Sequence, residues 1–398
     1  MRLENSSYEV LYPVIKNMED GAEPMNVCFL LTHVPNPRMN KRIEVFKKIA
    51  DTKVICTRRA SQNIWEPSQD VEHIIFDIDL PSAKHIVKRY VVSQDFQKKA
   101  LEKLEELSPN TIYAEGLDSL IIAGKYKKNH AVTIIFEVAD LRENYIVRPK
   151  KLADRIITDA LLRKEKKAFR NVDYLVVTSP KFYDMHYQDL ISKDRMQFIP
   201  NAPDIEVFKN YKKKNGGTFT VGFIGGIRYL QQMKMLVDVA SEVGFNVLFA
   251  GAGGTSTEYD EIRKYCEGMK NVTFTGKYNY DTEIAGLYGK VDCVFSVYDA
   301  DNPNVKIALP NKLYESIICE LPIIVAKETY VSELVQQYGV GVAISHQDKT
   351  ELEEIMQRMK DDVQYRNSFA KKCREYKSQQ NNSSAMSKLE QIALQNEG

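Results

Sequence analysis

The chain has 398 residues, of which 43% are hydrophobic and 27% are charged, and its formal net charge is +1. This length is too great for one compact core and suits two α/β domains, and the composition excludes disorder as the default. The small net charge gives no support for a nucleic-acid-binding protein. The six cysteines lie far apart and form no Cys-x-x-Cys pair, which argues against a structural zinc site and for a reducing compartment.

The first ten residues, MRLENSSYEV, lack the apolar stretch of a signal peptide, and no run of about 18 apolar residues occurs. We therefore expect a cytoplasmic protein. Residues 1–24 are polar and form a predicted extension. From residue 25 onward, short apolar strands alternate with amphipathic helices, which predicts repeated β-α units with a parallel sheet. The predicted strands of the first half are NVCFLLTHV, KVICT, HIIFDID, TIYAE, VTIIFEV and YLVVTS.

A proline-containing turn, a lysine-rich run and a Gly-Gly pair in FIPNAPDIEVFKNYKKKNGG separate the two predicted domains, 25–203 and 204–370. The pattern then restarts with the strands TFTVGFIG, FNVLFAG, NVTFTG, CVFSVYD, LPIIVA and GVAI. Residues 371–398 are a predicted helical tail that can pack back on the N-terminal domain.

The stretch VGFIGGIRYLQQMK ends a strand at Gly225 and Gly226, places Arg228 next and then begins a helix. Glycines allow a phosphate to approach the backbone, and a helix start offers unpaired amides and a partial positive charge. Arg228 can hold phosphate oxygens in bidentate fashion. The alternative is a tight strand-to-helix turn with a surface arginine.

A second glycine-rich stretch, FAGAGGTSTEY, contains Gly251, Gly253 and Gly254 after a strand. The match to a dinucleotide fingerprint is incomplete, because the next strand ends in Thr-Gly where a nicotinamide-binding unit needs an acidic residue. We therefore interpret these glycines as a tight loop that lines a ligand cleft, with Gly253 as a donor-binding candidate.

Pro310 predicts a helix start in ALPNKLYESIICELPIIVA, because its missing N–H costs nothing there. The amides of Asn311, Lys312 and Leu313 would then face a bound diphosphate, and Lys312 adds a full charge. Glu315, about a turn further, can accept hydrogen bonds from a ribose diol. The alternative is a carboxylate that only complements the helix dipole, which contributes ~0.3–1 kcal/mol.

In this order, the motifs resemble those of GT-B glycosyltransferases, most of all family 4. GFIGGIRYLQQMKMLVDVA is similar to the family's phosphate-loop helix, and LPNKLYESIICELPIIVA is similar to its donor-ribose helix and following strand. Three further stretches resemble parts of the family. IIFEVADLRENY resembles its strand with Glu-x-x-Asp-Leu, VVTSPKFYDMHY resembles its Ser-led helix, and FIPNAPDIEVF resembles its interdomain turn. The likeness extends from about Met25 to at least Ile344.

The resemblance implies an α/β GT-B fold, with two Rossmann-like, doubly wound parallel-sheet domains that face each other across a cleft. It also implies sugar transfer from a nucleotide-diphosphate sugar, with retention of the anomeric configuration. The donor is expected to be UDP- or GDP-linked, with UDP preferred. Arg228, Lys312 and helix amides would stabilise the departing diphosphate, so we expect neither a metal nor a cofactor.

Two positions depart from the family pattern. The family pairs two glutamates with seven residues between them; Glu315 is the second, and Ile307 stands in place of the first. Asp299 or Asp301 in the preceding loop are the candidates for contacting the sugar instead. The family's phosphate helix also supplies a lysine, and here Lys234 lies slightly beyond that place.

The N-terminal domain is expected to bind the acceptor. Glu137 and Asp140 follow the strand VTIIF and are the catalytic candidates, because either could orient or deprotonate an acceptor hydroxyl. Glu115 and His33 follow other strands and are acceptor-side candidates. The alternatives are helix capping for Asp140 and a structural role for His33.

The segment 148–170 contains nine Lys and Arg residues against three acidic ones, and an apolar face. It could rest on an anionic membrane at the inner face, or it could be an ordinary solvated amphipathic helix.

We predict a glycosyltransferase that transfers a sugar to a hydroxyl of a glycan or a lipid-linked saccharide in bacterial surface-polysaccharide biosynthesis. One rival is a nucleotide-sugar epimerase on the same fold, which would need further carboxylates and a histidine around the sugar. The other is a catalytically degenerate donor-binding subunit, which the missing first glutamate supports.

Overall fold

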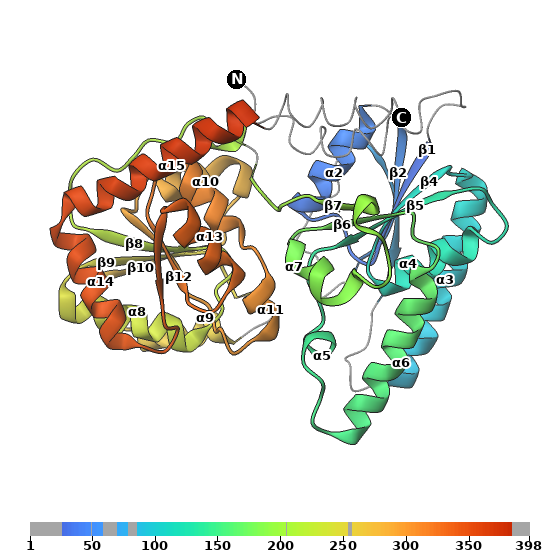
Figure 1. Cartoon of the computed structure of the whole chain (residues 1–398), viewed down its shortest axis with the longest axis horizontal. Helices are drawn as coiled ribbons and strands as arrows, with labels where there is room; N and C mark the ends of the chain where they lie inside the picture. The colour runs from blue at the N-terminus through green and yellow to red at the C-terminus, as the bar shows by residue number, and fades with distance from the viewer. Residues whose placement is uncertain are drawn as a thin grey trace. The chain divides into compact units, whose positions relative to one another are not determined.

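Two α/β units, divided between Pro200 and Asn201, make up the part of the chain that the computed structural model describes (Figure 1). The described residues are 26–48, 50–58, 70–78, 86–203, 205–253 and 257–383. The predicted extension 1–24 and the end of the predicted tail lie outside these residues.

The first unit contains a parallel sheet of seven strands in the order β3-β2-β1-β4-β5-β6-β7. The strands are β1 (Asn26–Leu31), β2 (Asp51–Arg58), β3 (Glu72–Asp77), β4 (Thr111–Glu115), β5 (Thr133–Val138), β6 (Tyr174–Val177) and β7 (Met196–Phe198). The helices are α2 (Pro37–Lys47), α3 (Ile86–Leu107), α4 (Leu117–Tyr126), α5 (Glu143–Ile146), α6 (Leu152–Phe169) and α7 (Pro180–Phe182), followed by the short turns η2 (Tyr183–Tyr187) and η3 (Lys193–Arg195).

Both faces of this sheet are covered, which is why β1 is an unbroken apolar run. Val27 and Phe29 point to one face and pack with Met39 and Phe46 of α2 in one core cluster. Cys28 alternates with them and is equally buried from the other side. The sequence pattern therefore predicted the central strands correctly.

The second unit contains a parallel sheet of six strands in the order β10-β9-β8-β11-β12-β13. The strands are β8 (Thr220–Ile224), β9 (Asn246–Ala250), β10 (Val272–Gly276), β11 (Cys293–Ser296), β12 (Ile323–Ala326) and β13 (Gly341–Ile344). The helices are η4 (Ile205–Phe208), α8 (Leu230–Val243), α9 (Glu258–Tyr265), α10 (Tyr280–Tyr288), α11 (Pro303–Ile307), α12 (Asn311–Ile318), α13 (Tyr330–Tyr338), α14 (Lys349–Asp361) and α15 (Val363–Ser383).

Helix α15 contains the described part of the predicted tail and packs within its own unit. Its Arg374 and Lys377 both form ion pairs with Glu320, at 2.6 and 2.7 Å, just before β12. Cys373 is buried, as are the other five cysteines, and all six are free thiols. Among the described residues, no helix combines the length and the apolar character that a bilayer-crossing segment needs.

Each sheet has a switch point, where the chain leaves the first strand toward one edge and later returns on its other side. These points lie between β1 and β4 in the first unit and between β8 and β11 in the second. In open α/β sheets, ligands bind outside the carboxyl ends of the strands at such points. Candidate sites are therefore sought after β1 and β4 and after β8 and β11.

Candidate functional site

The turn after β8 is shaped by Gly225, whose φ of +128° is open to glycine and strained for other residues. A Cβ atom there would lie 2.8 Å from Nζ of Lys312. Lys312 comes from the first turn of α12, so the structure brings these two predicted donor-binding residues together. The absent side chain leaves room for the ammonium group beside the turn.

Lys312 is buried, and aromatic rings surround its ammonium group. Nζ donates a hydrogen bond to the hydroxyl of Tyr298 at 2.8 Å. It also lies 5.1 Å from the ring centre of Phe223 in β8 and 5.3 Å from that of Tyr298. Cation–π contacts of this kind hold an ammonium in place without neutralising its charge. The arrangement therefore preserves a fixed positive charge at the carboxyl edge of the sheet.

The neighbouring candidates of α12 differ in accessibility. Asn311, the first residue of the helix, is half-buried. Leu313 is fully buried, and its amide donates to the carbonyl of Pro310 at 3.1 Å. That amide is thus already used by the helix start.

Arg228 is exposed and folds back over the glycine turn. A Cβ atom on Gly226 would lie 3.7 Å from Nε of Arg228. This is an ordinary van der Waals distance, so the guanidinium group lies beside the turn without requiring glycine at position 226. Gly225, Gly226, Arg228 and Lys312, four predicted donor-binding residues, thus lie around the same turn.

The start of α8 holds a carboxylate that the sequence analysis missed. Glu258, the first residue of α9, accepts hydrogen bonds from the amides of Tyr229 and Leu230 at 3.1 and 3.3 Å. Tyr229 has a φ of +70°, a left-handed conformation that is uncommon outside glycine. The amides that were predicted to face a phosphate here are therefore already paired with a negative charge.

The loop after β9 lies directly against the glycine turn. A Cβ atom on Gly251 would lie 1.9 Å from the carbonyl oxygen of Gly225, and the amide of Ile227 donates to the carbonyl of Ala252 at 3.1 Å. Gly253 follows in this loop and so stays near the turn.

Lys234 is not part of this group. Its ammonium lies 5.0 Å from the ring centre of Tyr265, at the end of α9.

Glu315 is buried, and tyrosine hydroxyls occupy both its oxygens. Tyr280 donates to Oε1 at 2.8 Å and Tyr288 donates to Oε2 at 2.6 Å, both from α10. Burial, followed by the charge of Glu315, raises the pKa of both tyrosines, so both hydroxyls keep their protons. Each carboxylate oxygen has a second lone pair, so the pair of tyrosines orients Glu315 without using all of its accepting capacity.

The predicted sugar-contact residues Asp299 and Asp301 lie with His346, which follows β13. Nδ1 of His346 is 3.3 Å from Oδ1 of Asp299, and Nε2 is 3.9 Å from Oδ1 of Asp301. Gln232 of α8 donates to the carbonyl of His346 at 3.1 Å. One ligand atom from each of the three side chains lies within 4.8 Å of the others, so the group could hold a cation.

In the first unit, Glu137 lies in a buried ion-pair cluster. Its oxygens accept from Arg38, from Tyr113 and, at 3.4 Å, from Nε of Arg42. Asn36 caps α2 by accepting from the amide of Met39, which sets the start of the helix that carries both arginines. A carboxylate that is 1% exposed and bound by three donors is poorly suited to act as a base.

Arg38 also binds Glu115 at 2.5 Å, and Glu115 in turn contacts His33. Nε2 of His33 is 3.1 Å from the Glu115 carboxylate, and Nδ1 is 2.8 Å from the Val34 carbonyl. Neither partner can donate, so both ring nitrogens must carry protons for both bonds to form. The structure therefore brings the two acceptor-side candidates together as an imidazolium–carboxylate pair.

The pKa values of this pair agree with that protonation. Burial lowers the pKa of His33, but the hydrogen bond and charge of Glu115 outweigh it and raise the pKa overall. Burial raises the pKa of Glu115, but Arg38 and His33 outweigh it and bring the pKa to about 2.

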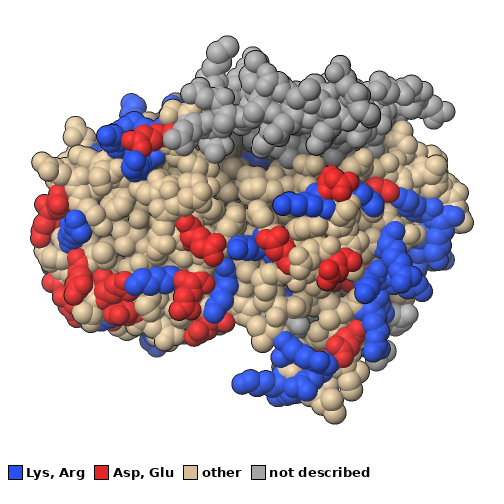
Figure 2. Space-filling view, in the orientation of Figure 1, with Lys and Arg blue, Asp and Glu red and all other residues tan. Residues whose placement is uncertain are grey.

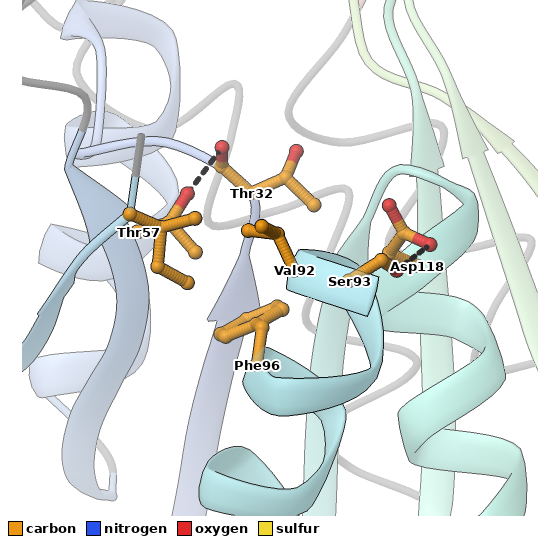
Figure 3. A pocket seen from close by; sticks show the side chains of 7 residues that line it. Thr32, Thr57, Val92, Ser93, Phe96 and Asp118 are labelled. Atoms are coloured by element: carbon orange, nitrogen blue, oxygen red, sulfur yellow. Dashed lines mark hydrogen bonds between the residues drawn. The ribbon is translucent and has the colours of Figure 1, made fainter. Parts of the chain in front are cut away.

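A small hollow lies at the same sheet edge (Figure 3). It is lined by Thr32, Thr57, Ile78, Val92, Ser93, Phe96 and Asp118. Ser93 donates to Asp118 at 3.0 Å, and Thr57 donates to the Thr32 carbonyl at 2.7 Å. Asp140 follows β5, is exposed, and is not among the residues that line this hollow.

Comparison with known proteins assigns the second unit. Residues 204–376 match the family model described as glycosyl transferases group 1. The C-terminal unit is a glycosyltransferase group 1 domain. No curated protein matches the sequence of this glycosyltransferase.

The fold of the whole chain is also that of known glycosyltransferases. The sucrose-phosphate synthase of Thermosynechococcus elongatus aligns with a TM-score of 0.68 and 17% identity, over 93% of this chain and 97% of that one. Anabaena HepE, solved in complex with UDP, aligns at 0.66 and 16%, over 94% and 100%. The lipopolysaccharide outer core galactosyltransferase WaaB aligns at 0.55 and 12%, over 88% and 100%. The prediction of a GT-B glycosyltransferase is thus confirmed, while family 4 stays a prediction.

Proposed function

We propose that this glycosyltransferase takes its sugar from a UDP-sugar, which the C-terminal unit binds at the carboxyl edge between β8 and β11. The observation that carries the proposal is the positive charge of Lys312, held by Tyr298 and Phe223 beside Gly225. Anabaena HepE has been solved with UDP and with UDP-glucose, which supports a uridine nucleotide here.

The proposed chemistry rests on stabilising the departing diphosphate. As the glycosidic bond breaks, negative charge develops on the bridging oxygen, and preorganised cations in a partly buried site stabilise that charge more than they would in water. Lys312 supplies a fixed charge, and the exposed Arg228 supplies a fork of donors above Gly226. We propose that these two residues act without a metal.

We further propose that Glu315 binds the ribose hydroxyls of the donor. Tyr280 and Tyr288 fix the position of its carboxylate, and an ionised carboxylate is a suitable acceptor for two neighbouring hydroxyls.

For the acceptor, we propose the carboxyl edge of the first sheet, where His33, Glu115 and the hollow beside Asp118 lie. The acceptor is a hydroxyl of a glycan or a lipid-linked saccharide, and we propose a role in surface-polysaccharide synthesis with retention at the anomeric carbon. Of the two catalytic candidates, Asp140 is the accessible one.

A panel of UDP-, GDP- and other nucleotide sugars tests the proposal, with release of the nucleoside diphosphate and the fate of the sugar measured together. Slow hydrolysis or transfer from a UDP-sugar is expected. Recovery of an isomerised sugar would favour an epimerase, and binding without turnover would favour a donor-binding subunit.

Arg228→Ala should lower turnover sharply, because it removes a charge that acts on the leaving group. Arg263→Ala, an exposed arginine of α9, is the matched control. Equal activity of the two variants would contradict the role of Arg228.

A further inference from the structure

Helix α6 exposes apolar side chains and buries polar ones. Leu152 is 72% exposed and Ile156 is 63% exposed, whereas Thr158 and Glu165 are buried. At about 100° per residue, Leu152 and Ile156 share one side of the helix, and Thr158 and Glu165 lie roughly opposite. A helix whose only role is to cover a sheet has the reverse arrangement.

The second half of α6 fixes this orientation. Glu165 accepts a hydrogen bond from the hydroxyl of Tyr187 at 2.8 Å, and His186 lies 3.8 Å from its other oxygen. The buried ring of Phe169 stacks on Tyr187 with centres 5.0 Å apart. Residues 151–157, in contrast, are exposed throughout. The start of the helix therefore projects from an anchored end and cannot easily rotate its apolar side inward.

Four exposed apolar residues lie on the first turns of α6 and in the loop before it. Val147, just before the helix, is 56% exposed, and Ile157 is 45% exposed beside Leu152 and Ile156. In Figure 1, the start of α6 and the loop that leads into it make up the lowest part of their unit. We call these four residues the α6 tip. Clustered exposed apolar groups of this size mark a surface that contacts another apolar phase.

Cationic side chains surround the α6 tip, and Figure 2 shows Lys and Arg gathered over this part of the unit. The exposed ones nearest in sequence are Arg142, Arg148, Lys150, Lys151, Arg155, Arg163, Lys164, Lys166 and Lys167. Arg163 and Lys167 continue the side of the helix that carries Leu152 and Ile156. With a rise of 1.5 Å per residue, Arg163 lies about 10 Å along the helix from Ile156.

We propose that the α6 tip inserts into the surface of a bilayer that contains anionic lipids, while the surrounding cations contact lipid phosphates. Interfacial segments bury their apolar residues about 5–10 Å into the boundary between headgroups and acyl chains. Charge complementarity favours an anionic membrane over a neutral one, and it adds to the apolar contact. The proposal does not depend on which donor the enzyme uses.

Cosedimentation of the full-length protein with vesicles of phosphatidylcholine and phosphatidylglycerol, about 70 to 30, tests the proposal. Wild type is expected to bind these vesicles and to bind pure phosphatidylcholine at least tenfold more weakly. It should dissociate as salt rises from 0.05 to 0.5 M, because salt screens charges over a Debye length of about 10 Å at 0.1 M and over less at higher salt. The double variant L152Q/I156Q should bind the anionic vesicles at least tenfold more weakly.

Two matched controls separate insertion from general surface effects. Val363→Gln changes an apolar residue of similar exposure in the other unit, and K98Q/K99Q removes two exposed charges from α3. Both should bind like wild type, whereas R163Q/K167Q should bind severalfold more weakly. All changed side chains are exposed, so the thermal unfolding midpoints should agree. Absent binding by wild type, or undiminished binding by L152Q/I156Q, would overturn the proposal; neither result would bear on donor use.

Discussion

Glu315 accepts hydrogen bonds from two tyrosines and is also the residue that we propose to bind the donor ribose. Glu315→Gln replaces one acceptor oxygen by a donor, which faces the hydroxyl of Tyr280 or Tyr288. We expect UDP binding, measured by titration calorimetry, to weaken by ~1.5–3 kcal/mol, the range for a lost hydrogen bond to a charged group.

Tyr280→Phe is the matched control, because it removes one hydrogen bond to Glu315 and leaves the carboxylate in place. It should retain most of the affinity for UDP. If the two variants lose affinity equally, the carboxylate supports the helix packing and does not contact ribose.

His33 gives a pH-dependent prediction. The pKa of His33 should lie above 6.5 in the folded protein. Glu115→Gln should lower this pKa, because burial and the charge of Arg38 then disfavour the imidazolium without an opposing carboxylate. NMR titration of the ring protons measures both values. His73 in β3, whose pKa burial lowers, serves as the internal control and should not change.

The sign of the stability effect follows from the same shifts. The raised pKa of His33 stabilises the fold fully below pH 6.5, and this contribution is lost as pH rises through the folded-state pKa. The lowered pKa of Glu115 stabilises the fold above pH 4.5, and this contribution is lost as pH falls toward about 2. Stability that rises from pH 6 to 9 in wild type relative to Glu115→Gln would contradict the pair.

At the scale of elements, the start of α8 depends on Glu258. Glu258→Gln keeps an acceptor for the amides of Tyr229 and Leu230 but removes a negative charge near the proposed diphosphate. UDP affinity should rise severalfold, since one unit charge at about 4 Å contributes ~1 kcal/mol in water. Glu261→Gln on the exposed side of α9 is the control. Weaker UDP binding by Glu258→Gln would mean that this carboxylate contacts the donor itself.

The loops after β11 and β13 give a prediction about metals. Asp299, Asp301 and His346 could hold a cation, yet the proposed chemistry uses Lys312 and Arg228. We expect EDTA to leave turnover unchanged, and D299N/D301N to alter sugar preference more than nucleotide affinity. Loss of activity in EDTA that added metal restores would assign these three residues a catalytic ion.

The elements themselves could be predicted from the sequence because buried parallel strands are continuous apolar runs. Gly225 follows such a run directly, and Pro310 marks the start of the helix that carries Lys312 and Glu315. The contacts that define the site could not be predicted from the sequence. Glu258 binds the amide of Tyr229, which is 29 residues away in the sequence. Tyr280 belongs to an amphipathic helix, and its sequence context does not indicate a bond to Glu315. Arg38 lies in the first turn of α2, where the sequence gives no sign that it is buried. Only the fold brings it to Glu115 and Glu137. Such contacts depend on which strands become neighbours, which local pattern does not specify.

At the scale of the whole molecule, each unit has its own sheet and core, so we expect two unfolding transitions in calorimetry. UDP at about 100 times its Kd should stabilise the C-terminal unit by ~2.7 kcal/mol, because that unit carries the proposed donor groups. The transition of the N-terminal unit should stay nearly unchanged. Arg228→Ala should reduce this shift. An equal shift of both transitions would mean that donor binding involves the first unit as well.

The strand order of the first sheet also has a consequence for synthesis. One neighbour of β1 is β2, which follows at once, but the other is β4, and the contact between Asn26 and Asn110 spans 84 residues. At translation rates of about 5–20 residues per second, one edge of β1 waits roughly 4 to 17 s for its partner on the ribosome. The segment Val27–Leu31 is entirely apolar, so a translational pause before Thr111 prolongs the time for which this strand edge is unpaired and prone to aggregate. Nascent chains paused there would therefore depend most on a chaperone.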